Sequence, residues 1–362
     1  MFEYRLRVMN MDFLKNKIIR EDMDNIFRAG SYEALKGKTV LVTGPYGMLA
    51  SYVMFFLLYL NEIHNFETEI VSISRNTSKL EKRFGRYTNQ IININQSANE
   101  SLDVKCDYII HAASLASPDV YEKYSVDVAL PNIIGTYHLL ELASKVNAKL
   151  LFFSSSCVYG DFKGEGQLVT ESDFGSMNPL SSHSCYDESK RAGEMLCGAY
   201  HKQKGVSTVM ARIAHNYGPT MDIEGDPRVF ASFVKNALAG ENIEMKSDGS
   251  AQRSFCYASD ATAAYFKLLL EGKPGEAYNV CNTQQTVSIK ELGQIVADLG
   301  NVELIQMIRS DTENYLQDTS PDTLRYSNEK IKKLGASFDI DVRSGFSRIL
   351  EFYKEVGGDI WR

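Results

Sequence analysis

Near the amino end of the chain, a short β-branched run leads directly into a glycine-rich turn. Residues 38–43 are Lys-Thr-Val-Leu-Val-Thr, a composition typical of a buried parallel strand. The turn has the spacing Gly-x-x-Gly-x-x-Ala over Gly44, Gly47 and Ala50, and an apolar helix is expected over 51–60. Such a turn lets backbone amides approach a pyrophosphate, whose charge the helix N-terminus favours. The turn could simply need its glycines, but a strand before it and a helix after it favour a dinucleotide site. The expected cofactor contacts in this stretch are Gly44, Tyr46, Gly47, Met48 and Leu49.

A second apolar strand, 69–73, ends at Ser74, Arg75 and Asn76. Folds selective for NAD usually carry Asp or Glu here to bind the adenosine ribose hydroxyls. Arg75 could instead meet the 2′-phosphate of NADP, or it could stack on adenine or lie in solvent. We expect NAD or NADP as the cofactor, favour NADP, and count Arg75 and Asn76 among its contacts.

A third strand, 107–110, ends in His111 followed by Ala112, Ala113 and Ser114. The three small residues suit passage of a cofactor across the edge of the sheet, so we expect them to contact it. We interpret His111 as a structural imidazole rather than a ligand. Alternation of strands and helices over 38–210 predicts an α/β fold with a doubly wound, Rossmann-type parallel sheet.

Tyr186 and Lys190 stand four residues apart in a segment of good helical composition. Positions i and i+4 share a helix face, so the hydroxyl and the ammonium can point into one pocket. A nearby cation lowers the pKa of a tyrosine toward a range useful for a general base. Ser154 and Ser155 end the apolar run 150–153 at the same predicted sheet edge. On most helices such a Tyr and Lys form a solvated surface pair, but the nucleotide site upstream favours a catalytic set of Ser155, Tyr186 and Lys190.

After residues 209–213 the pattern changes to loops, short strands and helices, without a linker long enough for an independent domain. We expect a dinucleotide-binding domain over 37–213 and a smaller, mainly substrate-binding α/β part over 214–362, with some chain returning to the first domain. Residues 1–36 form an amphipathic, charged extension, with a helix expected around 11–28. We interpret it as a docking or oligomer-contact segment.

Composition excludes several classes of protein. The chain has 362 residues, 44% hydrophobic and 23% charged, as in ordinary globular proteins. A net charge of -7 without a long basic run argues against a nucleic-acid partner. The six cysteines lack zinc-site spacing, so we expect no metal and reduced thiols in a cytoplasmic protein. The amino end does not resemble a signal peptide, and the longest apolar run, 53–60, is too short to span a bilayer, so no membrane is expected.

Three longer phrases carry a family resemblance. They are His-Ala-Ala-Ser-Leu-Ala-Ser-Pro at 111–118, Ser-Cys-Tyr-Asp-Glu-Ser-Lys-Arg at 184–191 and Arg-Ser-Phe-Cys-Tyr-Ala-Ser-Asp at 253–260. Together they resemble the extended short-chain dehydrogenases, the NAD-dependent epimerase/dehydratase family of nucleotide-sugar enzymes. The resemblance covers roughly residues 37–355, and its wording is most similar to the UDP-glucuronate decarboxylase (UDP-xylose synthase) branch.

The resemblance implies a shared first step. Tyr186 would remove the proton of a sugar 4-hydroxyl while C4 gives hydride to a tightly bound, recycled nicotinamide. Lys190 would hold the tyrosine as phenolate and bind the nicotinamide ribose, and Ser155 would hydrogen-bond the same sugar oxygen. Ser154 would be a further cofactor contact. Any of the arginines at implied substrate positions could instead form a surface salt bridge. The substrate positions implied are Ser117, Ser156, Cys157, His215, Asn216, Arg228, Ser232, Arg253 and Arg325.

Three positions depart from the family pattern. Dehydratases and decarboxylases usually carry Glu as an acid/base where this chain has Cys157, and a thiol has the wrong pKa and reach for that role. His215 replaces the usual Asn of the Asn-x-Tyr-Gly-Pro loop, and an expected Arg is replaced around His183. The substrate of the decarboxylases therefore cannot be copied to this chain.

We favour an enzyme that oxidises C4 of a nucleotide-diphosphate sugar to a 4-keto intermediate in an epimerase-type reaction, which needs no such Glu. The alternatives are a UDP-glucuronate decarboxylase using another acid, with Arg325 as its candidate, and a 4,6-dehydratase. An alternative of another class is a nucleotide-sugar-binding protein without turnover. The resemblance also implies a homodimer through the helix of Tyr186 and its neighbour.

Overall fold

The computed structural model describes residues 12–161, 168–245, 247–307, 325–358 and 360–361. At the centre of these residues lies a seven-stranded sheet with the order β12-β7-β5-β4-β1-β2-β3. Its neighbouring strands are all parallel, which confirms the predicted α/β fold. The strands are β1 (Thr39–Thr43), β2 (Glu69–Ile73), β3 (Ile91–Ile94), β4 (Tyr108–His111), β5 (Lys149–Ser155), β7 (Thr208–Ile213) and β12 (Glu276–Val280).

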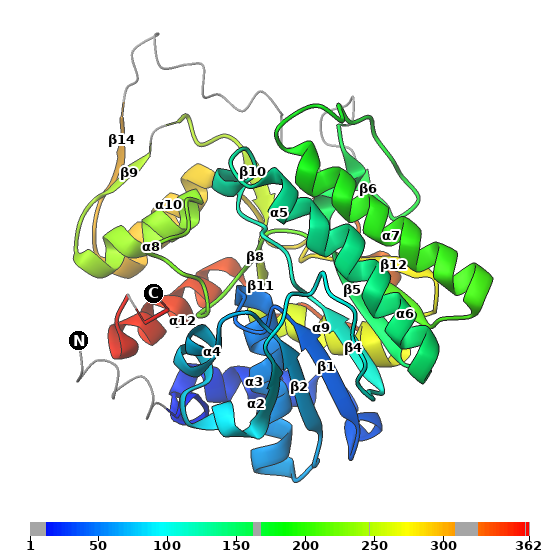
Figure 1. Ribbon diagram of the computed structural model, residues 1–362. Helices are drawn as coiled ribbons and strands as arrows, with labels where there is room; N and C mark the ends of the chain where they lie inside the picture. Colours follow the sequence, from blue (N-terminus) through cyan, green and yellow to red (C-terminus); the bar gives the residue numbers. More distant parts are fainter. Residues whose placement is uncertain (1–11, 162–167, 246, 308–324, 359, 362) are drawn as a thin grey trace.

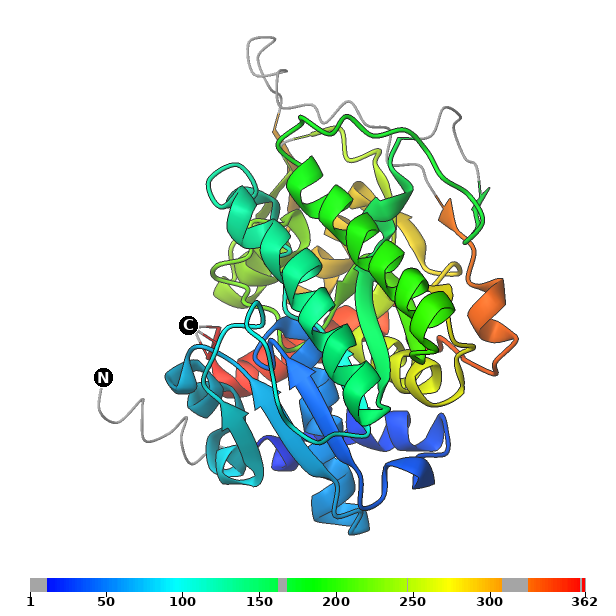
Figure 2. The same ribbon diagram turned by 45° about the vertical axis from the view of Figure 1, so that its right-hand side comes forward.

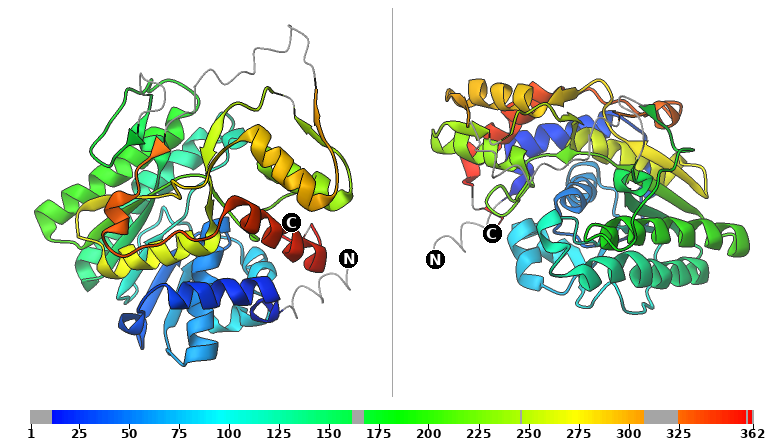
Figure 3. Two further views of the ribbon diagram at one scale, coloured as in Figure 1. Left: turned by 180° about the vertical axis from the view of Figure 1, so that it is seen from behind. Right: turned by 90° about the horizontal axis from the view of Figure 1, so that it is seen from above.

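Helices cover both faces of this sheet (Figure 1). On one face α3 and α9 pack against it and against α2, which is plain from behind (Figure 3). On the other face α6 and α7 run side by side, with α5 beside α7 (Figure 2). These helices are α2 (Lys17–Arg28), α3 (Met48–His64), α5 (Ser125–Leu130), α6 (Thr136–Val146), α7 (Ser184–Lys204) and α9 (Ala258–Glu271).

The order of the strands reverses between β1 and β4. From β1 the chain builds outward to β2 and β3, and it then returns to β4 on the other side of β1 before continuing to β5, β7 and β12. Ligands of open parallel sheets bind in the crevice at the carboxyl ends of the two strands that flank such a reversal. The residues after β1 and β4 therefore mark the place to examine for a cofactor.

The helix after β1 is longer than the sequence predicts, and it is buried all round. Residues 50–60 of α3 are each buried, because α2 and α9 cover the side of the helix that faces away from the sheet. A helix that is apolar all round needs such cover. It begins after Gly47 and ends at Asn65, which takes the left-handed conformation with φ 54°.

The apolar face of the amino-terminal helix α2 packs within the chain, and the docking or oligomer-contact role expected for residues 1–36 stays a prediction. The apolar residues Ile19, Met23 and Ile26 of α2 are buried in the same apolar core as α3 and α9. Its carboxylate Asp22 is fully buried and bonded to Arg348 of the last helix, α12 (Val342–Val356). An amphipathic pattern predicts that one face is covered, and here the cover comes from the chain itself.

The carboxyl-terminal part contributes to both regions. Its strand β12 joins the edge of the main sheet, while α8 (Val229–Ala239), α10 (Ile289–Gly300) and α12 pack together beside it. Short strands pair as β8 (Asn216–Tyr217) with β11 (Cys256–Tyr257), and β10 (Gln252–Ser254) with β13 (Thr286–Ser288). One large apolar core extends through these elements and through α3. The division at residue 213 stays a prediction.

Besides short 3-10 and π segments, the described chain also holds two helices and two two-stranded pairs. They are α4 (Thr77–Phe84), α11 (Glu329–Lys332), the pair of β9 (Ile243–Met245) with β14 (Leu304–Gln306), and the pair of β6 (Leu168–Val169) with β15 (Arg325–Tyr326). Within the described ranges we find that every helix is either too short or too polar to span a membrane.

Candidate functional site

The turn after β1 comes within contact distance of the chain that follows β4. Gly44 has φ +65°, and a Cβ placed on it would lie 2.9 Å from Cα of Ala113. Gly47 precedes α3, whose first turn receives no side-chain cap. The amides at the start of that helix are therefore available to an anion. This concave backbone can accept a pyrophosphate, as the glycine spacing predicts.

His111 holds the two strand ends together. Its Nε2 lies 3.0 Å from the Pro131 carbonyl oxygen, which can only accept, so the proton is on Nε2. Nδ1 therefore accepts from the Thr43 hydroxyl at 2.8 Å. The Thr43 oxygen in turn accepts from the amides of Ala112 and Ala113 at 3.1 and 3.0 Å. Burial lowers the pKa of His111 to about 3, with the Lys190 charge acting in the same direction. The structural interpretation of this imidazole is confirmed.

The residues at this edge fit a dinucleotide. The Ser114 hydroxyl is buried and has no hydrogen-bond partner within the described chain. A buried polar group of this kind needs a partner, and a hydroxyl or amide of a bound cofactor would supply one. Ser114, the Gly44 turn and the start of α3 would hold the cofactor, and its nicotinamide would supply a hydride acceptor.

The end of β2 presents basic groups around Tyr46. Arg75 is exposed and its charge lowers the pKa of Tyr46, which burial raises. Lys79, which the sequence analysis did not single out, lies 5.9 Å from the centre of the Tyr46 ring. The Ser74 hydroxyl donates to Asn93 at 2.9 Å. Asn76 accepts from the Lys79 amide at 3.0 Å and caps α4, so this side chain is occupied within the chain.

Ser155, Tyr186 and Lys190 meet at the carboxyl end of β5. All three are buried, and Lys190 Nζ donates to the Phe153 carbonyl at 2.6 Å. The same Nζ lies 5.7 Å from the centre of the Tyr186 ring. Tyr121 stacks on that ring at 5.2 Å and 13°, a contact that no sequence spacing indicated.

The pKa of Tyr186 departs from the expected direction. Burial raises it most, Cys157 raises it further, and the hydrogen bond of Ser155 and the charge of Arg228 lower it. The net shift is upward, opposite to the lowering expected from Lys190. Burial also lowers the pKa of Lys190 to about 7, so this ammonium is close to losing its charge at neutral pH.

Arg228 and His215 reach the same place from the carboxyl-terminal part. Arg228 Nε lies 2.8 and 3.0 Å from the two carboxylate oxygens of Asp226, and its Nη2 lies 4.0 Å from Met48 Sδ. Its charge acts on Tyr186 and on His215. His215 has φ 47°, a conformation that His adopts more readily than most residues. Burial lowers the pKa of His215 to about 3, and Arg253 and Arg228 act in the same direction.

Cys157 is exposed and lies close enough to Tyr186 to raise the pKa of its hydroxyl. Its amide donates to Ser155 Oγ at 3.2 Å, and its side chain hydrogen-bonds the carboxylate of Asp187. Burial raises the pKa of Asp187 to about 6, against lowering by His183 and by this bond. Asp187, which was not among the predicted site residues, thus places a carboxyl group beside Cys157, where the family resemblance leads us to expect Glu.

Several predicted substrate contacts are hydrogen-bonded within the chain or are exposed. The Asn216 amide donates to the Tyr265 hydroxyl at 2.7 Å inside the core, and the Ser117 hydroxyl donates to Asp119. Ser156 begins the short helix that carries Cys157. Ser232 is exposed on α8 and Arg325 is exposed on β15. Substrate roles for these residues stay predictions.

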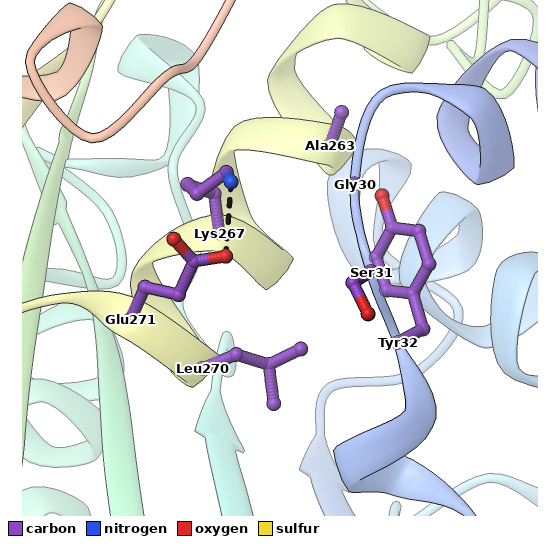
Figure 4. Close-up of a pocket in the computed structure, with 7 residues that line it drawn as sticks. All are labelled: Gly30, Ser31, Tyr32, Ala263, Lys267, Leu270 and Glu271. Carbon is purple, nitrogen blue, oxygen red and sulfur yellow. Dashed lines mark hydrogen bonds and ion pairs between the residues drawn. The ribbon is translucent and has the colours of Figure 1, made fainter.

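A small hollow elsewhere has no link to this site (Figure 4). It separates the segment after α2 from α9 and is too narrow to admit water, and the Lys267–Glu271 ion pair lies on its α9 side at 2.9 Å. It is lined by Gly30, Ser31, Tyr32, Ala263, Lys267, Leu270 and Glu271.

The fold and the site at the β1/β4 edge define a dinucleotide-binding enzyme with a buried Tyr–Lys pair. Comparison with known proteins gives its family. Residues 40–281 match the model of the NAD dependent epimerase/dehydratase family, and the chain belongs to that family.

Similar proteins agree with this assignment. The chain is 34% identical over 319 residues to UDP-glucuronic acid decarboxylase 6 of Arabidopsis thaliana, covering 87% of this chain and 88% of that protein. It is 31% identical to UDP-glucuronic acid decarboxylase 1 of Xenopus tropicalis, covering 78% and 66%. Among solved structures, the fold is similar to UDP-glucose 4-epimerase of Thermotoga maritima, with a TM-score of 0.72, 20% identity and coverage of 88% and 99%. UDP-glucuronic acid 4-epimerase of Bacillus cereus gives a TM-score of 0.69 with 21% identity, covering 88% and 99%.

Proposed function

We propose that this enzyme oxidises C4 of a nucleotide-diphosphate sugar and returns the hydride to the resulting 4-keto sugar in an epimerase-type reaction. The observation that carries the proposal is the meeting of Ser155, Tyr186 and Lys190 at the carboxyl end of β5, beside the cofactor edge. Residue 157 is a cysteine and therefore supplies no carboxylate. Epimerisation needs only oxidation, rotation of the keto sugar and reduction on its other face, so it requires no carboxylate at position 157.

In this proposal Tyr186 takes the proton of the sugar 4-hydroxyl. In the free protein Ser155 hydrogen-bonds Tyr186 and lowers its pKa, and with substrate bound its single hydroxyl hydrogen would go to the same sugar oxygen. The positive charge of Lys190, which is held by the Phe153 carbonyl, would stabilise the Tyr186 phenolate, the form that accepts this proton. Arg228 and Arg253, whose charges converge on His215, would bind the diphosphate. When the hydride returns to C4, Tyr186 gives the proton back to the oxygen.

Decarboxylation of a nucleotide uronate is the second candidate, and two observations favour it. The curated relatives compared above are UDP-glucuronic acid decarboxylases. In addition, Asp187 offers a carboxyl group with a pKa of about 6 at Cys157, where it could serve as the missing acid. Asp187 is adjacent to Tyr186 in the sequence, whereas Arg325, the candidate acid named from the sequence, is not.

The deciding experiment incubates the purified protein with UDP-glucuronate, UDP-glucose and their GDP, CDP and dTDP counterparts, followed by mass spectrometry and proton NMR. An isomer of unchanged mass supports epimerisation. Loss of carbon dioxide from UDP-glucuronate establishes decarboxylation instead, and loss of water establishes a 4,6-dehydratase. Tyr186→Phe distinguishes an enzyme from a binder without turnover, because an enzyme loses turnover while it keeps nucleotide-sugar binding.

We further propose NADP as the preferred form of the cofactor. The family description names NAD. Arg75 and Lys79 place two positive charges around Tyr46 at the end of β2, where the 2′-phosphate of NADP would lie.

We also propose a homodimer through α5, α6 and α7. Val126, Leu130, Ile134 and Tyr137 form an exposed apolar row that continues from α5 into α6, and Met195 is exposed on α7. Exposed apolar rows of this kind mark protein–protein contacts. A cytoplasmic location is proposed as well, since all six cysteines are thiols and four of them are buried.

A further inference from the structure

Two side chains from consecutive turns of α7 form hydrogen bonds with two neighbouring residues at the end of β5. The Phe153 carbonyl accepts from Lys190 Nζ at 2.6 Å, and the Ser154 hydroxyl donates to Glu194 Oε1 at 2.5 Å. Residues 190 and 194 are one turn apart, so the ammonium and the carboxylate share a helix face. Glu194 is the main charge that raises the pKa of Lys190 against the effect of burial.

The Glu194 carboxylate has one fixed orientation. Arg212, from β7, donates through Nε at 3.0 Å to Oε1 and through Nη2 at 2.8 Å to Oε2. Each of these two side chains is only 12% exposed. Arg212 is itself held, because its Nη1 donates to the Glu171 carbonyl at 3.1 Å and its guanidinium lies 4.8 Å from the centre of the Tyr159 ring. A bidentate pair of this kind fixes geometry as well as charge.

The other groups facing Lys190 do not replace this carboxylate. His111, on β4, is neutral because its pKa is about 3. Tyr186, on the same helix, is protonated because burial raises its pKa. Cys157, on the short helix after β5, raises the pKa of Lys190 less than Glu194 does. Among the charges that act on Lys190, Glu194 therefore opposes the effect of burial most, and Arg212 offsets part of its negative charge.

We propose that Glu194 is a positioning residue that keeps Lys190 charged beside Tyr186, and that Arg212 sets how strongly it does so. The inference rests on the proposed C4 oxidation, in which Lys190 must be charged to favour the Tyr186 phenolate. Glu194 touches neither sugar nor cofactor in this account. It acts through Lys190 and through the end of β5, which it holds by Ser154.

The test reads the charge of Lys190 without using activity. Protein labelled with ¹³C at the lysine ε-carbon is titrated by NMR, and the Lys190 resonance is assigned with Lys190→Met. We expect Glu194→Gln to lower the pKa of Lys190 by about one unit. Arg212→Gln releases the carboxylate from its partner, so it shifts the pKa of Lys190 upward. A merely structural ion pair would leave that pKa unchanged in both variants, and this result overturns the proposal.

Matched variants keep the test decisive. Glu188→Gln removes an exposed carboxylate from the same helix and should leave the Lys190 titration unchanged. If the glutamine variants do not fold, Glu194→Asp and Arg212→Lys take their place, because both keep the charge. Glu194→Asp should shift the pKa of Lys190 less than Glu194→Gln does. A shift in Arg212→Gln in the same direction as in Glu194→Gln overturns the proposed role of Arg212.

Turnover gives a second readout. In Glu194→Gln the alkaline limb of the kcat/KM profile should move to lower pH, because Lys190 loses its proton earlier. If the wild-type protein turns over no nucleotide sugar, the proposed function fails, while the shifted Lys190 resonance still supports the role of Glu194. An unmoved resonance in an active enzyme overturns the role of Glu194 alone.

Discussion

Thr43 Oγ1 and His111 Nδ1 lie 2.8 Å apart across the carboxyl ends of β1 and β4. This bond joins the two strands between which the order of the sheet reverses. Because the same hydroxyl accepts from the amides of Ala112 and Ala113, it also fixes the loop that faces Gly44. The shape of the cofactor edge thus depends on one buried hydroxyl.

Replacing this hydroxyl should destabilise the fold and weaken cofactor binding together. Thr43→Val leaves Nδ1 of His111 and two amides without their partner, so we expect a loss of about 3 kcal/mol in the free energy of unfolding. Thr39→Val is the matched control, because its hydroxyl bonds Glu69 at the exposed end of the same strand, and it should change stability by less than about 0.5 kcal/mol. Urea denaturation and NAD titration measure both variants, and equal effects would contradict the role given to Thr43.

The glycine turn offers a test with a close control. Gly44 and Gly37 have φ +65° and +64°, but a Cβ on Gly44 meets Ala113, whereas one on Gly37 has nothing within 4 Å. Gly44→Ala should weaken NAD binding at least tenfold, by roughly 1.4 kcal/mol or more. Gly37→Ala should cost about 1 kcal/mol of stability through backbone strain and leave NAD affinity unchanged. Fluorescence titration with NADH compares the two, and unchanged affinity in Gly44→Ala would argue against a pyrophosphate at this turn.

Much of the cofactor edge was predictable because its signals are local. The strand at 69–73 was placed without error and β1 within one residue, since β-branched runs bounded by turn residues suffice. The spacing of Tyr186 and Lys190 also predicted that they share a helix face, and both are buried at the carboxyl end of β5. The cofactor contacts expected at 112–114 stay a prediction. Residue spacing could not predict the surroundings of these side chains, which decide their pKa values. The pKa of Tyr186 follows from its burial against Tyr121 and Val128, which depends on tertiary packing.

Other parts were missed because their partners are distant in the sequence. Glu194 lies on α7, whereas its partners Ser154 and Arg212 lie on β5 and β7, so no sequence motif marks its role. Asp187 lies within the motif, but only its contact with Cys157 gives it a possible function. Lys79 faces Tyr46 from the helix after β2. Residue propensities predict where helices and strands lie, whereas these side-chain contacts depend on how the helices and strands are arranged in space.

The choice between NADP and NAD is tested at Arg75. If its guanidinium binds a 2′-phosphate, Arg75→Ala loses a charge-assisted hydrogen bond only with NADP. We expect NADP affinity to fall roughly tenfold to a hundredfold and NAD affinity to change little. Isothermal titration with both nucleotides measures the difference, and Lys79→Ala should show a smaller effect in the same direction. Equal losses for the two nucleotides would remove the 2′-phosphate argument.

The proposed dimer is tested on its apolar row. Val126 is 66% exposed near the start of α5, and Ile92 is 52% exposed on the edge strand β3. Val126→Asp would bury a charge in the dimer contact, so we expect monomers at concentrations where the wild-type chain is dimeric. Ile92→Asp introduces the same charge outside the row and should leave the dimer intact. Light scattering after size exclusion measures the mass, and a monomeric wild-type chain at micromolar concentration would contradict the proposal.

The last prediction concerns the ion pair that joins the two ends of the chain. Asp22 on α2 is fully buried and accepts from Arg348 on α12 at 2.8 Å, and also from the hydroxyls of Tyr52 and Tyr257. Asp22→Ala leaves the guanidinium and both hydroxyls short of a partner, so we expect a loss of about 3–5 kcal/mol in the free energy of unfolding. Glu21→Ala is the matched control, since its 44% exposed carboxylate pairs with the same arginine, and solvent limits its contribution to about 1 kcal/mol or less. Urea denaturation compares the two variants. A similar small loss in both would mean that α2 is held by its apolar face alone and that Asp22 adds little to its attachment.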